Sequence, residues 1–153
     1  MQLEHLSWRD TLAPGDIVAF AFPTSEPDAA HEKQRPGLVI AVDRSGADAE
    51  AIIAYGTAAM TRANTGMELR IMRPADMAAA HLRKPTRFVG SRSVRVPLDS
   101  PRFIVSAAST AVIGRLPSAF HPRLDRLREL TAASAPAIPS ARRWPRRSLS
   151  YAG

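Results

Sequence analysis

Short apolar segments separated by turn residues recur along the first part of the chain and predict β-strands. In residues 17–22, valine and phenylalanine alternate with smaller side chains, which is the two-residue period of a strand that places its bulky face on a core. Residues 37–42 are a continuous apolar run, which is typical of a strand buried on both faces, and residues 49–55, with the apolar segment 51–54 inside them, predict the next buried strand. We therefore expect each of these segments to be a strand of one sheet.

The rest of the chain predicts shorter strands and small helices. Strand patterns recur over residues 67–71, 86–98, 103–105 and 112–116. Helices are expected over residues 74–82, which begin with a proline, and over about 122–131, where Leu124, Leu127 and Leu130 form one apolar stripe. Thirteen prolines against eight glycines also favour short strands over long helices. The expected fold is mainly β, a compact curled barrel of mostly antiparallel strands with small helices.

The composition changes near residue 132, where alanine, serine, proline and arginine come to dominate. The 153 residues fit one ordinary domain, so we divide the chain into a barrel domain at 1–133 and a tail at 134–153 that we expect to be disordered. That tail contains four arginines and no acidic residue, out of a net charge of +7 for the chain. Removing it leaves +3 on the barrel domain, and the positive excess favours a polyanionic partner.

Several classes of protein are excluded by what the sequence lacks. The chain contains no cysteine, which excludes a disulfide scaffold, a zinc ribbon and thiol catalysis. No apolar run approaches the ~20 residues that a membrane-spanning helix needs, and residues 1–5 do not resemble a secretory signal, so a cytoplasmic protein is expected. The four histidines lack metal-ligand spacing, and neither a phosphate-binding loop nor a dinucleotide or hydrolase motif is present. We therefore expect neither a metal site nor a cofactor.

The candidate chemistry lies around a polar segment, residues 23–36, that separates the first two expected strands. Arg35 precedes Pro36 at the junction of this loop with a buried strand, and its planar guanidinium suits phosphate and stays charged. Thr57 ends another expected strand, where its hydroxyl could reach the end of a neighbouring strand. A purely structural interpretation stays open as well, because arginine before proline can anchor a loop and threonine is common at strand ends.

The order and spacing of several motifs resemble the toxin family of MazF, PemK and Kid. Residues 14–18 are similar to the Gly-Asp-(Ile/Val) strand of these proteins, residues 33–40 to their Arg-Pro-x-Leu-Val strand, and residues 52–57 to a strand that ends on threonine. Residues 112–117, before the last expected helix, are also similar to the family. The similarity extends over about residues 12–131 and is loose between 60 and 105.

This resemblance implies an SH3-like barrel with a C-terminal helix, a homodimer, and an endoribonuclease that cleaves single-stranded RNA (mRNA) without a metal ion or cofactor. The products would carry a 2′,3′-cyclic phosphate and a 5′-hydroxyl. The catalytic arginine and threonine of the family correspond to Arg35 and Thr57, and we expect Lys33 and Arg62 to bind the substrate. The resemblance also implies an acidic antitoxin as partner, which suits a basic toxin.

The general base is left open, because the guanidinium of Arg35 holds its proton too tightly to act as one. Asp28, His31 and Glu32 in the polar segment are the candidates. Two other functions also stay open: a non-catalytic module of the same fold that binds nucleic acid or protein, and a toxin of the related gyrase-poisoning type. The pair of Arg35 and Thr57 favours the ribonuclease.

Overall fold

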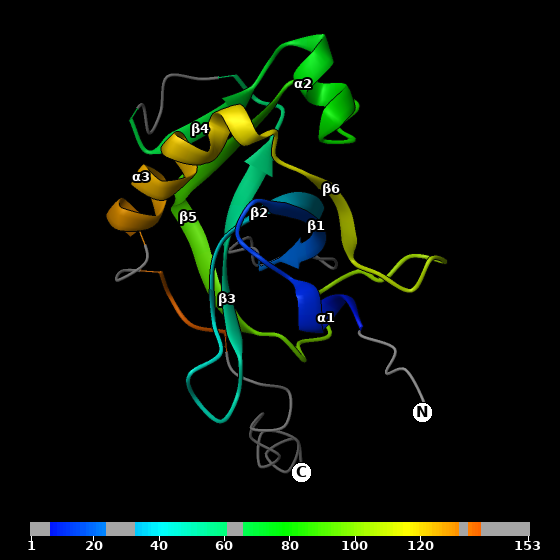
Figure 1. The fold of residues 1–153 in the computed structure, drawn as a ribbon, viewed down its shortest axis with the longest axis vertical. Helices are drawn as coiled ribbons and strands as arrows, with labels where there is room; N and C mark the ends of the chain where they lie inside the picture. The colour runs from blue at the N-terminus through cyan, green and yellow to red at the C-terminus, as the bar shows by residue number, and fades with distance from the viewer. Residues whose placement is uncertain (1–6, 24–32, 61–65, 132–134, 139–153) are drawn as a thin grey trace, which may run out of the picture.

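A computed structural model describes residues 7–23, 33–60, 66–131 and 135–138 (Figure 1). Six antiparallel strands form one sheet in the order β4-β5-β3-β2-β1-β6, which curls into a half-barrel. The strands are β1 (Asp16–Phe22), β2 (Lys33–Asp43), β3 (Glu50–Thr57), β4 (Glu68–Ile71), β5 (Thr86–Pro97) and β6 (Val112–Arg115). The helices are α1 (Trp8–Thr11), α2 (Pro74–Ala79), the 3₁₀ turn η1 (Ser118–Phe120) and α3 (His121–Thr131). The mainly β class, the curled barrel and the C-terminal helix expected from the sequence are confirmed.

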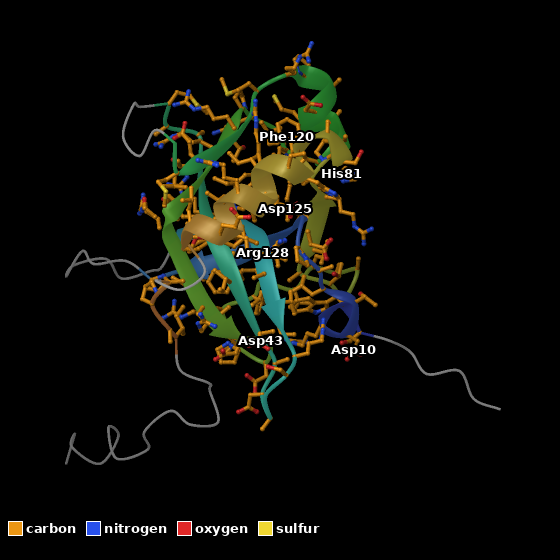
Figure 2. The ribbon with its side chains drawn as sticks, turned by 60° about the vertical axis from the view of Figure 1, so that its left-hand side comes forward. Asp10, Asp43, His81, Phe120, Asp125 and Arg128 are labelled. Carbon is orange, nitrogen blue, oxygen red and sulfur yellow. The ribbon has the colours of Figure 1, made fainter. Side chains whose placement is uncertain are left out.

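The central strands are buried on both faces because each face of the sheet has its own core. The helix-side core is the cluster in which Leu38, Ile40 and Ala54 pack with Leu124 and Leu127 of α3. Figure 1 shows α3 lying across this face, and its Arg128 (labelled in Figure 2) donates a hydrogen bond from Nε to the carbonyl oxygen of Ile40 at 2.7 Å.

The opposite face carries the aromatic core, the cluster in which Val39 and Ile53 pack with Phe20, Phe103 and Trp8. Because successive strand residues point to opposite faces, a strand between two cores has to be apolar throughout. The continuous apolar runs of the sequence are explained in this way. In the part of the chain that the structure describes, no helix is long and apolar enough to cross a membrane.

Two expectations about local structure are wrong. Residues 103–105 form no strand, since Phe103 makes only an isolated bridge to Phe20 and serves mainly to fill the aromatic core. Leu130 does not continue the apolar stripe of α3 and is 44% exposed. Because an α-helix has 3.6 residues per turn, the next inward position after Leu127 is Thr131, which is buried and donates its hydroxyl to the Leu127 carbonyl at 2.7 Å.

Residues 135–138 fall in the predicted tail, yet they lie along β5. The Arg95 N–H donates to the Pro136 carbonyl at 2.8 Å, and the Ile138 N–H donates to the Arg95 carbonyl at 2.6 Å. The side chain of Ile138 packs against the aromatic core. Strand β4 pairs with β5 only at residues 86–89, so this short segment occupies an edge of β5 that β4 does not reach. Residues 139–153 lie outside the described part, and the division at residue 133 stays a prediction.

Candidate active site

Arg35 and Pro36 lie inside β2, which corrects the expectation that they mark a junction of loop and strand. Residues 33–38 of β2 pair with β1, with Arg35 opposite Phe20. Pairing of β2 with β3 begins only at Gly37. A proline has no N–H to give to a neighbouring strand, and at Pro36 no ladder pair with β3 needs one. The proline therefore fits within the strand, and Arg35 is held by strand pairing rather than by a loop.

The register of β2 and β3 brings Arg35 and Thr57 to neighbouring positions. Gly37 and Tyr55 form the last pair of the two antiparallel strands, and Arg35 and Thr57 each lie two residues beyond this pair on its outer side. Thr57 is the last residue of β3, as the sequence predicts. The two predicted catalytic residues therefore come from adjacent strands at the same end of the sheet.

Gly56 allows these strand ends to approach closely. A Cβ atom at this position would collide with the carbonyl oxygen of Pro36 and come 2.9 Å from the ring of Phe88. Any larger residue would push β3 away from β2. Glycine is thus required between Tyr55 and Thr57 for the spacing of the candidate pair.

A pocket of about 520 Å³ opens at this end of the sheet, and both Arg35 and Thr57 line it. The segment that follows α2 supplies further polar side chains to the same pocket, namely His81, Arg83 and Lys84. No carboxylate of the described residues lines it. A pocket walled by cations in the absence of acids attracts an anionic ligand. Sequence reasoning missed Arg83 and Lys84, although two adjacent basic residues between a helix and Pro85 are a visible signal.

His81 adopts a left-handed backbone conformation, with φ of 58°, which is uncommon for a residue other than glycine. It follows α2, as Figure 2 shows, and it abuts β6. A Cβ at Gly114 would collide with the carbonyl oxygen of Ala80 and lie 3.2 Å from the Cβ of His81, so the chain is tightly held here. Strained conformations of this kind concentrate at functional sites. The sequence offered no signal for His81, because its place in the pocket depends on this long-range contact.

A buried ion pair holds the turn that follows Thr57. On β5, Arg87 lies directly opposite Thr57 in the strand register and is only 5% exposed. Its guanidinium donates from Nε to the carbonyl of Ala59 at 3.0 Å and forms an ion pair with Glu68 of β4 at 2.9 Å. The Thr57 hydroxyl oxygen in turn accepts a hydrogen bond from the Ala59 N–H at 3.1 Å. Arg87 was missed by sequence reasoning, because β5 contains two further arginines and nothing in the local pattern distinguishes Arg87 from them.

The guanidinium of Arg35 has no comparable partner among the described residues. Its Nε is buried and makes no hydrogen bond there. Its central carbon lies 5.9 Å from the centre of the Tyr55 ring, and the corresponding carbon of Arg92 lies 3.8 Å from the same centre. Arg35 therefore lines the pocket, while its guanidinium lies toward Tyr55 and its buried Nε has no described hydrogen-bond partner.

The other predicted site residues contribute less to this description. Lys33 is the first residue of β2, two positions before Arg35. Arg62 and the candidate bases Asp28, His31 and Glu32 lie outside the described residues. Their roles stay predictions.

Two carboxylates within the described ranges, Asp16 and Asp43, contribute to the scaffold. Buried Asp16 pairs with Arg115 at 3.1 Å. Hydrogen bonds from the side chain and the backbone N–H of Ser45 lower the pKa of Asp43, at the far end of β2 (Figure 2). Across residues 7–23, 33–60, 66–131 and 135–138, no group of three or more histidine, cysteine, aspartate or glutamate residues is placed to hold a metal ion.

No model of a known protein family matches the chain, and no curated protein matches it significantly. The resemblance to the MazF, PemK and Kid toxins therefore rests on the sequence motifs alone. Any functional assignment has to be argued from the pocket and its residues.

Proposed function

We propose that this chain is an endoribonuclease that cleaves single-stranded RNA without a metal ion, with Arg35 and Thr57 as its catalytic residues. The observation that supports the proposal is their common pocket, which Arg83 and Lys84 also line and which no described carboxylate enters. RNA is a polyanion, and several cationic side chains around one cavity favour binding of its phosphates. The net charge of +7 acts in the same direction.

The reaction that fits these residues is attack of a 2′-hydroxyl on the adjacent phosphodiester. The O2′–P bond forms and the P–O5′ bond breaks, so the products are a 2′,3′-cyclic phosphate and a 5′-hydroxyl. Negative charge builds on the non-bridging oxygens in the transition state. The fixed guanidinium of Arg35 and the hydroxyl of Thr57 can donate hydrogen bonds to these oxygens, which stabilises that charge without a metal ion.

Two protons must also move: one leaves the 2′-hydroxyl and one reaches the departing O5′. His81 is a candidate for this exchange because it lines the pocket and because imidazole transfers protons readily near neutral pH. It joins Asp28, His31 and Glu32 as a possible base. His81→Asn tests its role, since asparagine tolerates the left-handed backbone and cannot transfer a proton. We expect a loss of about 10²-fold in the cleavage rate with an unchanged melting temperature.

The proposal includes the biological setting that the motif resemblance implies. In this setting the protein is a homodimeric cytoplasmic toxin, and an acidic antitoxin neutralises it by covering the cationic pocket. A small acidic reading frame next to this gene would support the pairing. Co-expression of that frame with the chain should then restore growth to cells that the chain alone arrests.

The decisive experiment is incubation of the purified protein with long, mixed-sequence single-stranded RNA in excess EDTA. Mass spectrometry of the products should find cyclic phosphate and 5′-hydroxyl ends. Contaminating ribonucleases give the same ends, so Arg35→Ala and Thr57→Val, purified side by side, are the essential controls. Thr57→Ser should keep more activity than Thr57→Val because it retains the hydroxyl. Equal cleavage by wild type and Arg35→Ala, or cleavage that needs a divalent ion, contradicts the proposal, and RNA binding without cleavage favours a binding module.

A further inference from the structure

A second pocket, of about 410 Å³, lies beside Tyr55 near the end of β3. Its walls come from three places: Phe22 at the end of β1, residues 91–94 of β5, and residues 136–138. The ring of Tyr55 packs edge-on against Phe22, with 5.1 Å between ring centres and 78° between planes. The aromatic side of the pocket is therefore fixed by packing.

Two arginines flank the Tyr55 ring. Arg92 stacks its guanidinium over the ring at 3.8 Å, and Arg35 approaches it at 5.9 Å. Neither has an ion pair with a carboxylate of the described residues, and the buried Nε of Arg35 has no hydrogen-bond partner there. Two like charges on one ring repel each other. An anion between them would remove that repulsion and use donors that are otherwise idle.

Three buried or half-buried arginines differ from this pair, of which Arg92 is exposed. Arg102 donates to the carbonyl of Ala21 at 3.0 Å, and Arg128 donates to that of Ile40 at 2.7 Å. Arg87 has both a carbonyl and a carboxylate as partners. Each of these side chains is held to the backbone by its hydrogen bonds and therefore has a structural role. The pair at Tyr55 has no such hydrogen bond within the described residues, so the exposed guanidinium of Arg92, stacked on a ring at the pocket wall, is available to a ligand.

The segment 136–138 makes this pocket a built part of the fold. Its hydrogen bonds to the backbone of Arg95 hold it against β5, three residues after Arg92. On the opposite wall Ser93 donates its hydroxyl to the carbonyl of Gly90 at 2.7 Å. The pocket thus combines a rigid wall, an aromatic ring and the guanidinium of Arg92, and the guanidinium of Arg35 approaches the same ring from outside the pocket lining.

We infer that Arg92, together with Tyr55 and Arg35, forms a second phosphate subsite that binds a phosphodiester of the RNA next to the one that is cleaved. Arg35 connects the two sites, because it lines the first pocket and its guanidinium approaches Tyr55. Guanidinium groups bind phosphate through paired hydrogen bonds, and aromatic rings add favourable stacking for nucleotides. This inference rests on the proposed function and names a residue, Arg92, that contributes to substrate affinity and not to the chemical step.

The test uses Arg92→Ala and a single-stranded RNA whose 2′-hydroxyls are replaced by fluorine, so that it binds without being cleaved. Fluorescence anisotropy should show affinity about tenfold weaker than wild type. The slope of log affinity against log salt should become shallower by about 0.7, which corresponds to one lost phosphate contact on a single strand. The affinity of Arg92→Lys should fall between those of wild type and Arg92→Ala, since lysine keeps the charge and loses the planar fork.

Arg126→Ala is the matched control, because Arg126 is an equally exposed arginine on α3, which covers the opposite face of the sheet. It should bind like wild type. If Arg92→Ala and Arg126→Ala bind the RNA with equal affinity, whether at the wild-type level or below it, the subsite is overturned. With cleavable RNA, Arg92→Ala should raise KM and leave kcat nearly unchanged, and a fall in kcat alone also overturns it. A third outcome separates the two proposals: if Arg92→Ala binds RNA more weakly than wild type but the wild-type protein never cleaves RNA, the subsite is supported and the ribonuclease is contradicted.

Discussion

Thr57 lies between two arginine clusters that differ in whether the guanidinium groups have a carboxylate partner. Toward β5 and β4, buried Arg87 is paired with Glu68 and bonded to the carbonyl of Ala59. Toward β2, Arg35 and Arg92 share the Tyr55 ring and have no carboxylate partner among the described residues. The paired cluster fixes the backbone around Thr57, whereas the unpaired cluster leaves its donors available to a ligand. Partners and burial therefore distinguish structural from functional arginines where charge alone does not.

The two clusters should also differ in what they contribute to the free energy of unfolding. Removing one member of a buried ion pair strands the other charge in a poorly solvated place, which is strongly destabilising. Removing an arginine whose buried Nε lacks a partner eliminates an unsatisfied donor, which costs about 1–3 kcal/mol while it is present. Stability and activity should therefore respond in opposite ways to mutation on the two sides of Thr57.

The largest effect is expected for Arg87→Met, which should lower the free energy of unfolding by about 3–5 kcal/mol. The reason is that Glu68, a half-buried carboxylate, keeps only its ion pair with Arg70, while the Ala59 carbonyl loses a donor. Urea denaturation followed by circular dichroism measures the change. Adding Glu68→Gln should recover part of the loss, because it removes a carboxylate that would otherwise have only Arg70 as its ionic partner. If Arg87→Met alone is as stable as wild type, the ion pair does not stabilise the fold, and the two clusters do not differ in their contribution to the free energy of unfolding.

Arg35→Ala should have the next largest effect, on activity rather than on stability. Loss of a preorganised donor to the developing charge should reduce the cleavage rate by about 10²–10³-fold. The free energy of unfolding should stay equal or rise, because a buried donor without a partner disappears. Arg35→Lys should restore only part of the rate. Initial rates and thermal melting measured on the same preparations distinguish a catalytic from a structural role. If Arg35→Ala is destabilised but cleaves normally per folded molecule, Arg35 has a structural role.

The fold could largely be predicted from the sequence, because the strands between two cores need apolar residues on both faces. The local pattern failed where a tertiary role replaced it: Phe103 fills the aromatic core without joining a strand, and Leu130 falls off the inward face of α3. Pro36 was mistaken for a boundary since prolines usually stand at strand edges. It lies within β2, at a position where pairing with β3 has not begun.

The candidate site was predictable only in part. Arg35 and Thr57 could be named from the sequence, but their position at the same end of two adjacent strands follows from the register of those strands. Arg87 and His81 could not be found, because they reach the site through β5 and through the contact of residue 80 with β6. Such long-range pairings have no counterpart in local periodicity. The catalytic roles themselves stay predictions until the variants are measured.

Gly56→Ala changes the spacing between the candidate catalytic residues without touching either. Its new Cβ would collide with the Pro36 carbonyl, so β2 and β3 must separate at this end. We expect a loss of about 1–3 kcal/mol of stability from overpacking and a fall of at least about tenfold in cleavage per folded molecule. Gly46→Ala is the matched control, because its new Cβ would meet nothing closer than 3.9 Å. Normal cleavage by Gly56→Ala would show that the close approach of the strands does not matter for the pair.

The smallest effect is expected from two truncations that differ only in whether residues 135–138 are kept. Deleting 139–153 or 135–153 removes the same four arginines, so both should flatten the salt dependence of RNA binding equally if those arginines touch RNA. Only the longer deletion also removes the two hydrogen bonds to Arg95 and the wall beside Arg92. It should therefore lower the free energy of unfolding by a further ~1–2 kcal/mol, which corresponds to a drop of about 5 °C in melting temperature. It should also weaken RNA affinity a few-fold. Differential scanning calorimetry and anisotropy on both truncations measure this difference. If the two proteins melt together and bind RNA alike, the segment contributes nothing to the unpaired cluster, and Arg92 has to bind its ligand from the strand alone.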